Sequence, residues 1–221
     1  MRNLGEPLVS IKREGISKAK KGNVVPFKGF KGKIAFLYIM NQSGGYLELI
    51  LGPMFSGKTT RLIQHYKAYK FIGKKIVVIN YSLDTRYSET ALSSHDRVEI
   101  PCVFTNALAD KTLWIDADVI LINEGQFFDD LVPTVIEMVD TYQKQVHICG
   151  LDGDFRRQRF GSLLDLIPYS DKVEKLSAFC GKCRDGTLAV FSHRVSTESA
   201  QVVIGSDNYM PLCRKCYQMC K

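Results

Sequence analysis

The sequence contains no run of about 18 consecutive apolar residues, which is the length that a membrane-spanning helix needs. The apolar stretch at residues 34–40 is shorter than this, and it follows a long basic stretch that does not look like a secretory signal. We therefore expect neither a membrane span nor a membrane partner, and we predict that the protein works in the cytoplasm.

Net charge is also lacking beyond residue 45. The whole chain carries a formal charge of +7, but residues 1–45 hold nine Lys and Arg against two acids and account for all of it. Nucleic-acid binding requires an excess of basic side chains to neutralise phosphates. We therefore expect no broad nucleic-acid-binding face on residues 46–221 and no nucleic-acid partner.

The seven cysteines do not read as a secreted disulfide framework, because four of them form two C-x-x-C pairs. Pairs of this kind supply four thiolates to a tetrahedral Zn²⁺ that holds a small β module together. The separation between the pairs exceeds the usual range of about 15–20 residues, so an extended loop should project from the zinc site. The predicted zinc ligands are Cys180, Cys183, Cys213 and Cys216.

Residues 1–45 show no sustained hydrophobic periodicity, and we interpret them as a disordered basic leader. Two alternatives stay open, namely an organelle-targeting peptide and a natural start at Met40. The rest of the chain should form a phosphate-loop domain at residues 46–172 and a zinc-binding domain at residues 173–221.

The segment GPMFSGKT at residues 52–59 fits the phosphate-loop pattern G-x-x-x-x-G-K-[ST]. It follows a predicted strand at residues 46–51 and precedes a predicted helix at residues 60–72, so its backbone N–H groups should face an anion. Lys58 is expected to reach the outer phosphates of a nucleoside triphosphate, and the Thr59 hydroxyl to ligate Mg²⁺. The predicted phosphate-binding residues are Gly52, Pro53, Met54, Phe55, Ser56, Gly57, Lys58 and Thr59.

Apolar runs beyond the loop alternate with helical patterns. The predicted strands lie at residues 75–80, 119–122 and 145–150, and a further helix is predicted at residues 129–143. This alternation predicts an α/β fold with a mostly parallel sheet of the phosphate-loop, RecA-like kind and helices on both faces, followed by a small β-rich zinc-ribbon domain. Residues that follow the strands should converge on one site with the phosphate loop.

Glu124 directly follows a buried strand, where a carboxylate can accept a proton from an attacking hydroxyl or position a water. Asn123 precedes it at a place where a Mg²⁺-organising Asp is usual, and an amide brings no charge. Phe155 is expected to stack on a nucleobase or to pack in the core. The segment Asp84-Thr85-Arg86 either places a guanidinium near the phosphates or forms a surface turn.

Together these motifs resemble the type II thymidine kinases of cells and poxviruses. The resemblance covers residues 46–217 and is carried by LGPMFSGKT (51–59), DTRYS (84–88), SHDR (94–97), EGQFF (124–128), LDG (151–153) and the two Cys pairs. It implies ATP-dependent phosphorylation of the 5′-hydroxyl of thymidine or deoxyuridine, which yields the monophosphate for DNA synthesis by salvage. It also implies a homotetramer.

The resemblance further assigns roles to residues. It makes Glu124 the general base and the segment between the Cys pairs a lasso that closes over the nucleoside. Asn123 stands where the family has Asp, and the lasso assignments hold to about one position because the stretch at 204–209 is one residue short. The additional ATP-binding residues are Asp84, Thr85, Arg86, Asn123, Gly125 and Gln126. The nucleoside-binding residues are Met54, Phe127, Leu151, Phe155, Gln201, Val202, Val203, Ile204, Gly205 and Tyr209.

Two other functions share the phosphate loop and the zinc pattern. One is a zinc-containing phosphate-loop ATPase that acts on nucleic acid, which the neutral body and the lack of an aromatic, basic groove disfavour. The other is a scaffold that binds nucleotide without turnover, which Asn123 suggests.

Overall fold

The computed structural model of this protein describes residues 44–82, 91–94, 97–203, 205 and 208–220. The chain divides into two units, residues 1–41 and 42–221, and all described residues belong to the second. The leader predicted at residues 1–45 therefore lies outside the described residues except at its end.

The main sheet contains six strands in the order β5-β2-β6-β7-β1-β8, and every pairing within it is parallel. The central strands β1, β6 and β7 are buried along their whole length, as expected of a parallel sheet covered on both faces. The prediction of a mostly parallel sheet is confirmed. The six strands are β1 (Tyr46–Leu51), β2 (Ile76–Tyr81), β5 (Val103–Thr105), β6 (Val119–Ile122), β7 (Gln145–Gly150) and β8 (Lys172–Lys175).

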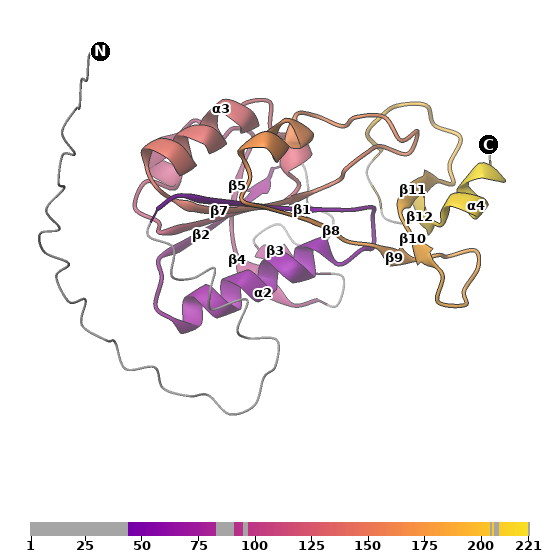
Figure 1. Cartoon of the computed structure of the whole chain (residues 1–221), viewed down its shortest axis with the longest axis horizontal. Coiled ribbons are helices and arrows are strands. Elements are labelled where there is room, and N and C mark those ends of the chain that lie inside the picture. The colour runs from indigo at the N-terminus through magenta and orange to yellow at the C-terminus, as the bar shows by residue number, and fades with distance from the viewer. Residues whose placement is uncertain (1–43, 83–90, 95–96, 204, 206–207, 221) are drawn as a thin grey trace, which may run out of the picture. The chain divides into compact units, whose positions relative to one another are not determined.

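Helix α2 (Lys58–Phe71) covers one face of the sheet, and α3 (Leu131–Ile136) lies on the other face with η4 (Leu163–Tyr169) (Figure 1). Helix α3 continues as a single π-helical turn, η3 (Glu137–Thr141). Both predicted helices exist, and α2 begins two residues before its predicted start because the phosphate loop caps it directly. The remaining short elements are η1 (Lys111–Leu113), η2 (Gly125–Phe127) and the antiparallel pair β3 (Ala91–Ser93) and β4 (Glu99–Pro101).

A small β module follows the main sheet and holds the four paired cysteines. It consists of two antiparallel ribbons, β9–β10 and β11–β12, and the helix α4, with a core of its own that includes Cys180, Cys213, Cys216 and Tyr217. The predicted β-rich domain is therefore present. Its elements are β9 (Ala178–Phe179), β10 (Leu188–Ala189), β11 (Phe191–Arg194), β12 (Tyr209–Leu212) and α4 (Arg214–Gln218).

Strand β8 was not predicted. It pairs in parallel with β1 and extends the main sheet past the boundary expected at residue 172. Three of its four residues, KVEK, are charged, and Val173 and Lys175 are exposed, as is common in an edge strand. The strands of the small module therefore start at Ala178.

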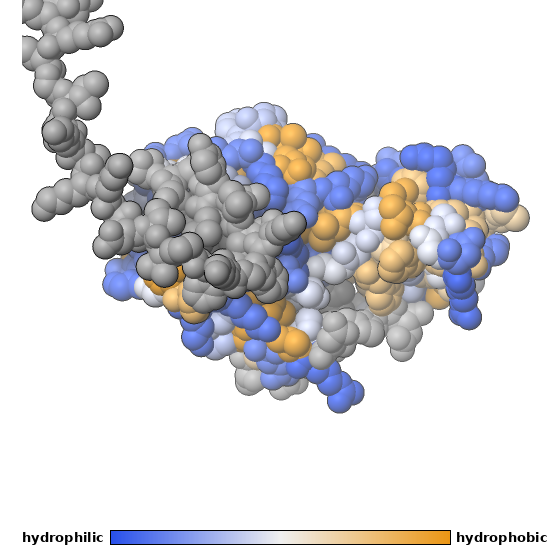
Figure 2. Space-filling model, turned by 60° about the horizontal axis from the view of Figure 1, so that its bottom comes forward, coloured by the Kyte–Doolittle hydropathy of each residue, from blue (hydrophilic) through white to orange (hydrophobic). Residues whose placement is uncertain are grey.

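Apolar side chains on the surface lie in separate groups among hydrophilic ones on the face shown in Figure 2. Among the large apolar side chains that the structure describes, Phe71 at the end of α2 is the most exposed, and Phe179 and Leu188 form an exposed cross-strand pair in the small module. None of the described helices combines the length and the apolar character needed to cross a membrane.

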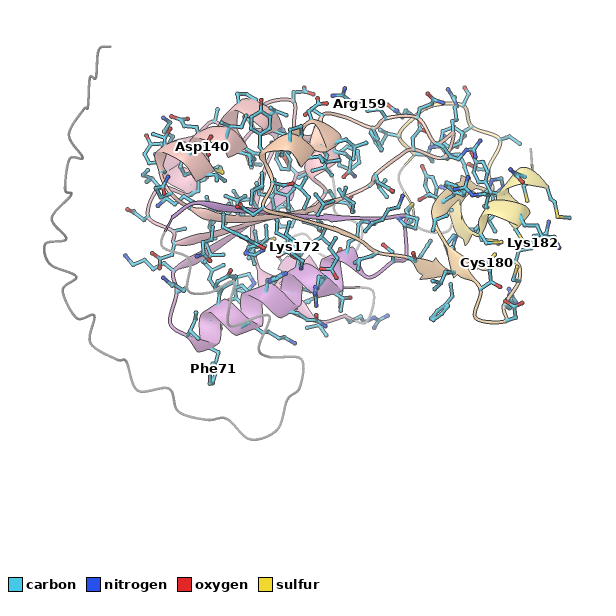
Figure 3. All side chains as sticks on the ribbon, viewed as in Figure 1. Phe71, Asp140, Arg159, Lys172, Cys180 and Lys182 are labelled. Atoms are coloured by element: carbon cyan, nitrogen blue, oxygen red, sulfur yellow. The ribbon has the colours of Figure 1, made fainter. Side chains whose placement is uncertain are left out.

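A buried polar cluster lies between α2 and the sheet, where Figure 3 shows Lys172. Glu48 on β1 accepts from His147 Nδ1 at 2.8 Å and lies 3.3 Å from His65 Nε2 on α2. Lys172 Nζ reaches the other oxygen of Glu48 at 2.6 Å, and the Tyr69 hydroxyl lies 2.9 Å from His147 Nε2. The ammonium of Lys172 balances the charge of Glu48, so the cluster joins α2 to three strands of the sheet as a paired network.

Burial and hydrogen bonding together determine which groups of this cluster carry a proton. Loss of hydration lowers the pKa of His65 to about 3, and the neighbouring His147 adds to the effect. Burial alone would raise the pKa of Glu48, but hydrogen bonds from His147 and Lys172 and the adjacent histidines lower it to about 2. Glu48 is therefore ionised and His65 neutral at physiological pH.

Candidate active site

The phosphate loop connects β1 to α2 and contains three residues with positive φ angles, Gly52, Phe55 and Gly57. Gly57 is the N-cap of α2, so the N–H groups of the first helical turn face the loop. The side chain of Lys58 is only 7% exposed, and its Nζ donates to the Pro53 carbonyl at 2.7 Å. The same carbonyl accepts from the Ser56 hydroxyl at 2.8 Å, so the loop already has a closed, cradle-like shape.

Asn123 lies at the carboxyl end of β6, directly behind the phosphate loop. Its Oδ1 accepts from the Thr59 hydroxyl at 3.3 Å and from the Cys149 thiol at 3.0 Å, while its Nδ2 donates to Asn80 Oδ1 at 2.9 Å. Thr59 and Asn123 thus offer two neutral oxygens beside each other. Mg²⁺ prefers charged oxygens, so these residues fit an ion whose charge is balanced mainly by bound phosphates.

Glu124 follows Asn123 in the left-handed backbone region, with φ 53° and ψ 46°. This conformation is uncommon for a residue other than glycine and persists where the surroundings fix it. Here Gln126 Nε2 donates to Glu124 Oε2 at 2.6 Å, and Gln126 Oε1 accepts from the Leu151 N–H at 3.0 Å. The carboxylate is therefore oriented by the turn after β6 and connected to the turn after β7.

A cavity of about 330 Å³ opens beside Glu124. The phosphate loop, the carboxyl ends of the strands, the segment after β7 and the loop between β11 and β12 all contribute to it. Aromatic rings dominate part of the wall: Tyr81 stacks on Phe127 with centroids 5.2 Å apart, and Phe160 meets Phe127 edge to face at 5.3 Å. The lining residues expected at a nucleoside are Met54, Phe127, Leu151, Phe155, Gln201, Val202, Val203, Gly205 and Tyr209.

A second hollow of about 100 Å³ lies over the phosphate loop. Its lining comprises the loop residues from Met54 to Thr60 together with Ser93, Glu124 and Leu151. Met54, Glu124 and Leu151 line both hollows. The carboxylate of Glu124 thus lies where a group in the larger cavity would meet a phosphate bound at the loop.

Some of the residues predicted to bind ATP do not line the hollow over the phosphate loop. Gly125 lines neither hollow and packs against the sheet, since a Cβ at this position would come within 2.6 Å of the Ile148 side chain. Gly52 and Pro53 line neither hollow, Asn123 accepts a hydrogen bond from Thr59, and Gln126 lines the larger cavity rather than the hollow over the loop. The predicted residues Asp84, Thr85, Arg86 and Ile204 lie outside the described residues.

Tyr81 is the last residue of β2, at the edge where the strand ends were expected to converge, and it lines the larger cavity. Four other lining residues were not predicted, namely Gly153, Asp154, Phe160 and Ser192. Asp154 is 7% exposed, and its carboxylate accepts from the N–H groups of Arg156 and Gln158 and from Gln201 Nε2. The only local signal for it is the turn sequence after β7. The Ser192 hydroxyl accepts from the Met54 N–H at 2.9 Å and so joins the small module to the phosphate loop.

The four paired cysteines converge, with ligand atoms within 4.8 Å of one another. Cys183 Sγ lies 3.8 Å from Cys213 Sγ and 3.4 Å from Cys216 Sγ, which are separations that a tetrahedral S₄ site requires. Burial alone would raise the pKa of the Cys180 thiol, but backbone N–H groups of Cys213, Cys183 and Lys182 lower it to about 6. The donor set fits a zinc ion, and four thiolates leave no open position for a substrate.

Comparison with known proteins shows that this chain is similar to one family over most of its length. A family model described as thymidine kinase matches residues 45–217. The thymidine kinase of variola virus is 44% identical over 177 residues, which covers 79% of this chain and 98% of the viral protein. The thymidine kinases of monkeypox virus and Yaba monkey tumor virus are 43% and 42% identical, with 98% and 97% of each relative covered.

A solved structure of Pif1 helicases at forked double-stranded DNA aligns with 60% of this chain and 35% of that chain, at 15% identity and a TM-score of 0.29. This likeness is too slight to bear on either fold or function.

Proposed function

The chain belongs to the thymidine kinase family, and from this membership we propose that it transfers the terminal phosphoryl group of ATP to the 5′-hydroxyl of thymidine or deoxyuridine. The observation that carries the proposal is the position of Glu124 on the boundary between the hollow over the phosphate loop and the larger cavity. A donor in one and an acceptor in the other would meet at this carboxylate.

The donor half consists of the phosphate loop. Its backbone N–H groups and the helix end of α2 suit the phosphates of ATP, and Lys58 supplies the positive charge. Thr59, supported by Asn123, is the residue proposed to hold Mg²⁺, which when bound would neutralise charge on the transferred group. Glu124 is the one acid among the described residues that line this hollow.

The acceptor half is the larger cavity. At about 330 Å³ it has the size and the apolar, aromatic wall typical of a small-ligand site. We infer that Phe155 and the pair formed by Tyr81 and Phe127 contact the thymine ring, because aromatic faces suit nucleobases. The loop between β11 and β12 would close over the nucleoside and exclude water from the reacting groups.

In the proposed reaction Glu124 accepts the proton of the 5′-hydroxyl as its oxygen forms a bond to the γ-phosphorus. The bond from the γ-phosphorus to the bridging oxygen breaks, and ADP leaves with that oxygen. Gln126 keeps the carboxylate in place through its hydrogen bond at 2.6 Å.

We further propose a structural zinc at the cysteine cluster, a homotetramer in solution and a role in nucleotide salvage for DNA synthesis.

The decisive experiment measures transfer of labelled phosphate from ATP to thymidine by the full chain and by Glu124→Gln. Removal of a general base typically lowers the rate about 10²–10⁴-fold, so we expect a loss in kcat of that size. Glu99→Gln replaces an exposed acid on β4 and serves as the matched control with unchanged activity. ATP hydrolysis that needs no thymidine and rises with DNA would favour the nucleic-acid ATPase, whereas binding without transfer would favour the scaffold.

A further inference from the structure

Arg194, the last residue of β11, is a buried cation without a carboxylate partner among the described residues. Its side chain is 5% exposed, and none of the ion pairs in the described part of the chain includes it. Burial of an unpaired charge is costly unless hydrogen bonds satisfy it. The Nε–H of Arg194 has no hydrogen-bond partner within the ranges that the structure describes, so the acceptors of Nη1 and Nη2 indicate the role of this guanidinium.

Three of the four acceptors are carbonyls of the loop between β11 and β12, and the fourth is a hydroxyl at the start of β12. Nη1 donates to the carbonyls of Glu198, at 3.1 Å, and Ala200. Nη2 donates to the carbonyl of Gln201 at 2.9 Å and to the Tyr209 hydroxyl at 2.5 Å. The Tyr209 hydroxyl in turn donates to the carbonyl of Val203 at 3.2 Å. One planar group thus connects the outgoing part of the loop to the start of β12, where the loop returns.

The guanidinium also supports the cavity wall. It lies over the Phe155 ring with its carbon 3.8 Å from the centroid, and over the Tyr209 ring at 5.1 Å. Phe155, Tyr209, Gln201 and Val203 all line the larger cavity, while Arg194 is not among its lining residues. Arg194 therefore acts on the cavity through other residues.

We propose that Arg194 is a positioning residue that gives residues 198–203 of the loop after β11 their shape before the nucleoside binds and fixes the Phe155 ring against which the base packs. This inference rests on the proposed function, because it takes the larger cavity as the nucleoside site. A preformed loop lowers the ordering entropy that binding would otherwise cost, so the effect should fall on nucleoside affinity rather than on ATP.

Arg194→Lys is the informative variant. Lysine keeps the charge but has a compact ammonium with three donors, which can neither reach all four acceptors nor stack a planar group on Phe155. We expect a rise of about tenfold in the KM for thymidine, which corresponds to about 1.4 kcal/mol, with the KM for ATP changed less than about twofold. An equal rise in both KM values, or no rise, would overturn the proposal.

Arg156→Lys is the matched control. Its guanidinium lies 4.8 Å from the same Phe155 ring and donates to the Ser199 carbonyl of the same loop, but its side chain is exposed. An exposed contact of this kind contributes little to the stability of the loop, so both KM values should stay within about twofold of those of the parent enzyme.

Hydrogen exchange tests the loop without activity. In the nucleoside-free protein the amides of Ser196–Val203 should exchange faster in Arg194→Lys, whereas those of the cysteine pairs should not change. Unchanged exchange in the loop would refute the positioning role. If Arg194→Lys fails to retain zinc, Tyr209→Phe removes only the shared hydroxyl and should still speed loop exchange. Failure of the parent chain to phosphorylate thymidine would refute the proposed function and leave this exchange test valid.

Discussion

The buried histidine on α2 should make the stability of this protein depend on pH. Burial lowers the pKa of His65 to about 3 from the ordinary value of 6.5. The unfolded chain therefore binds a proton below pH 6.5 that the folded chain does not bind until about pH 3. Stability rises with pH wherever the unfolded state holds more protons, so it should be complete above pH 6.5 and fall as the pH drops through this window.

The magnitude follows from the two pKa values. At pH 5.0 the pH lies about 1.5 units below the pKa of His65 in the unfolded chain, whereas His65 in the folded protein is still neutral. Since one pH unit corresponds to about 1.4 kcal/mol, the protein should lose about 2 kcal/mol of stability. Glu48 adds little to the loss of stability at this pH. Its folded pKa of about 2 lies below the ordinary 4.5, so its contribution is present above pH 4.5 and is lost as the pH falls toward 2.

The assay is urea unfolding of the zinc-loaded protein at pH 7.5 and pH 5.0, for the parent chain and for His65→Gln. Glutamine keeps an N–H donor for Glu48, which lies 3.3 Å from His65 Nε2, and does not titrate. It loses the stacking on His147, where the ring centroids are 4.4 Å apart, so it should cost about 1 kcal/mol at pH 7.5. Between the two pH values, however, it should lose about 2 kcal/mol less than the parent chain.

Zinc binding also weakens in acid, but both proteins have the same cysteine cluster, so the difference between their pH responses isolates His65. Equal losses in the two proteins would show that His65 is already protonated in the folded state, or that it is not buried as described.

Three further predictions concern the site and its supports. Cys183→Ser, or removal of zinc by a chelator, should abolish thymidine phosphorylation and lower the melting temperature of the small module, because metal binding contributes to its folding free energy. Retained activity without bound zinc would refute the structural role. Gly161→Ala places a Cβ 2.0 Å from the Gln126 carbonyl oxygen, at a residue with φ +60°, and this clash should lower the free energy of unfolding by about 4 kcal/mol in a denaturation assay. Gly186→Ala is the control, because at φ +89° its Cβ meets open space and should cost only about 1 kcal/mol. Asn123→Asp should not lower kcat at limiting Mg²⁺, because a charged oxygen beside Thr59 suits the ion better than an amide; a large loss in a Mg²⁺ titration would show that the amide bonds to Asn80 and Cys149 are required.

Much of the fold was predictable because its signals are local. The strands β1, β6 and β7 have the predicted bounds, since each is a short apolar run between turn residues. The phosphate loop and the cysteine pairs are motifs with a fixed spacing, and the structure places the cysteines together as that spacing indicates.

The features that were missed depend on contacts between distant segments. Glu48 and His147 meet across 99 positions of sequence, and neither sequence neighbourhood differs from that of an ordinary strand. Arg194 acts through backbone carbonyls, which every residue has, so no pattern of side chains marks its acceptors. The edge strand β8 lacks the hydrophobic run that reveals a strand buried on both faces.

Strand β11 connects the phosphate loop to the loop that borders the larger cavity. Its Ser192 holds the N–H of Met54 in the phosphate loop at 2.9 Å, and two residues later, on the same side of the strand, Arg194 holds the loop that borders the larger cavity. We therefore expect a ligand that orders the phosphate loop to order this strand as well, so that the conformational entropy is lost once for both hollows. The two ligands should consequently bind with positive coupling, and each should raise the affinity of the other by the same factor.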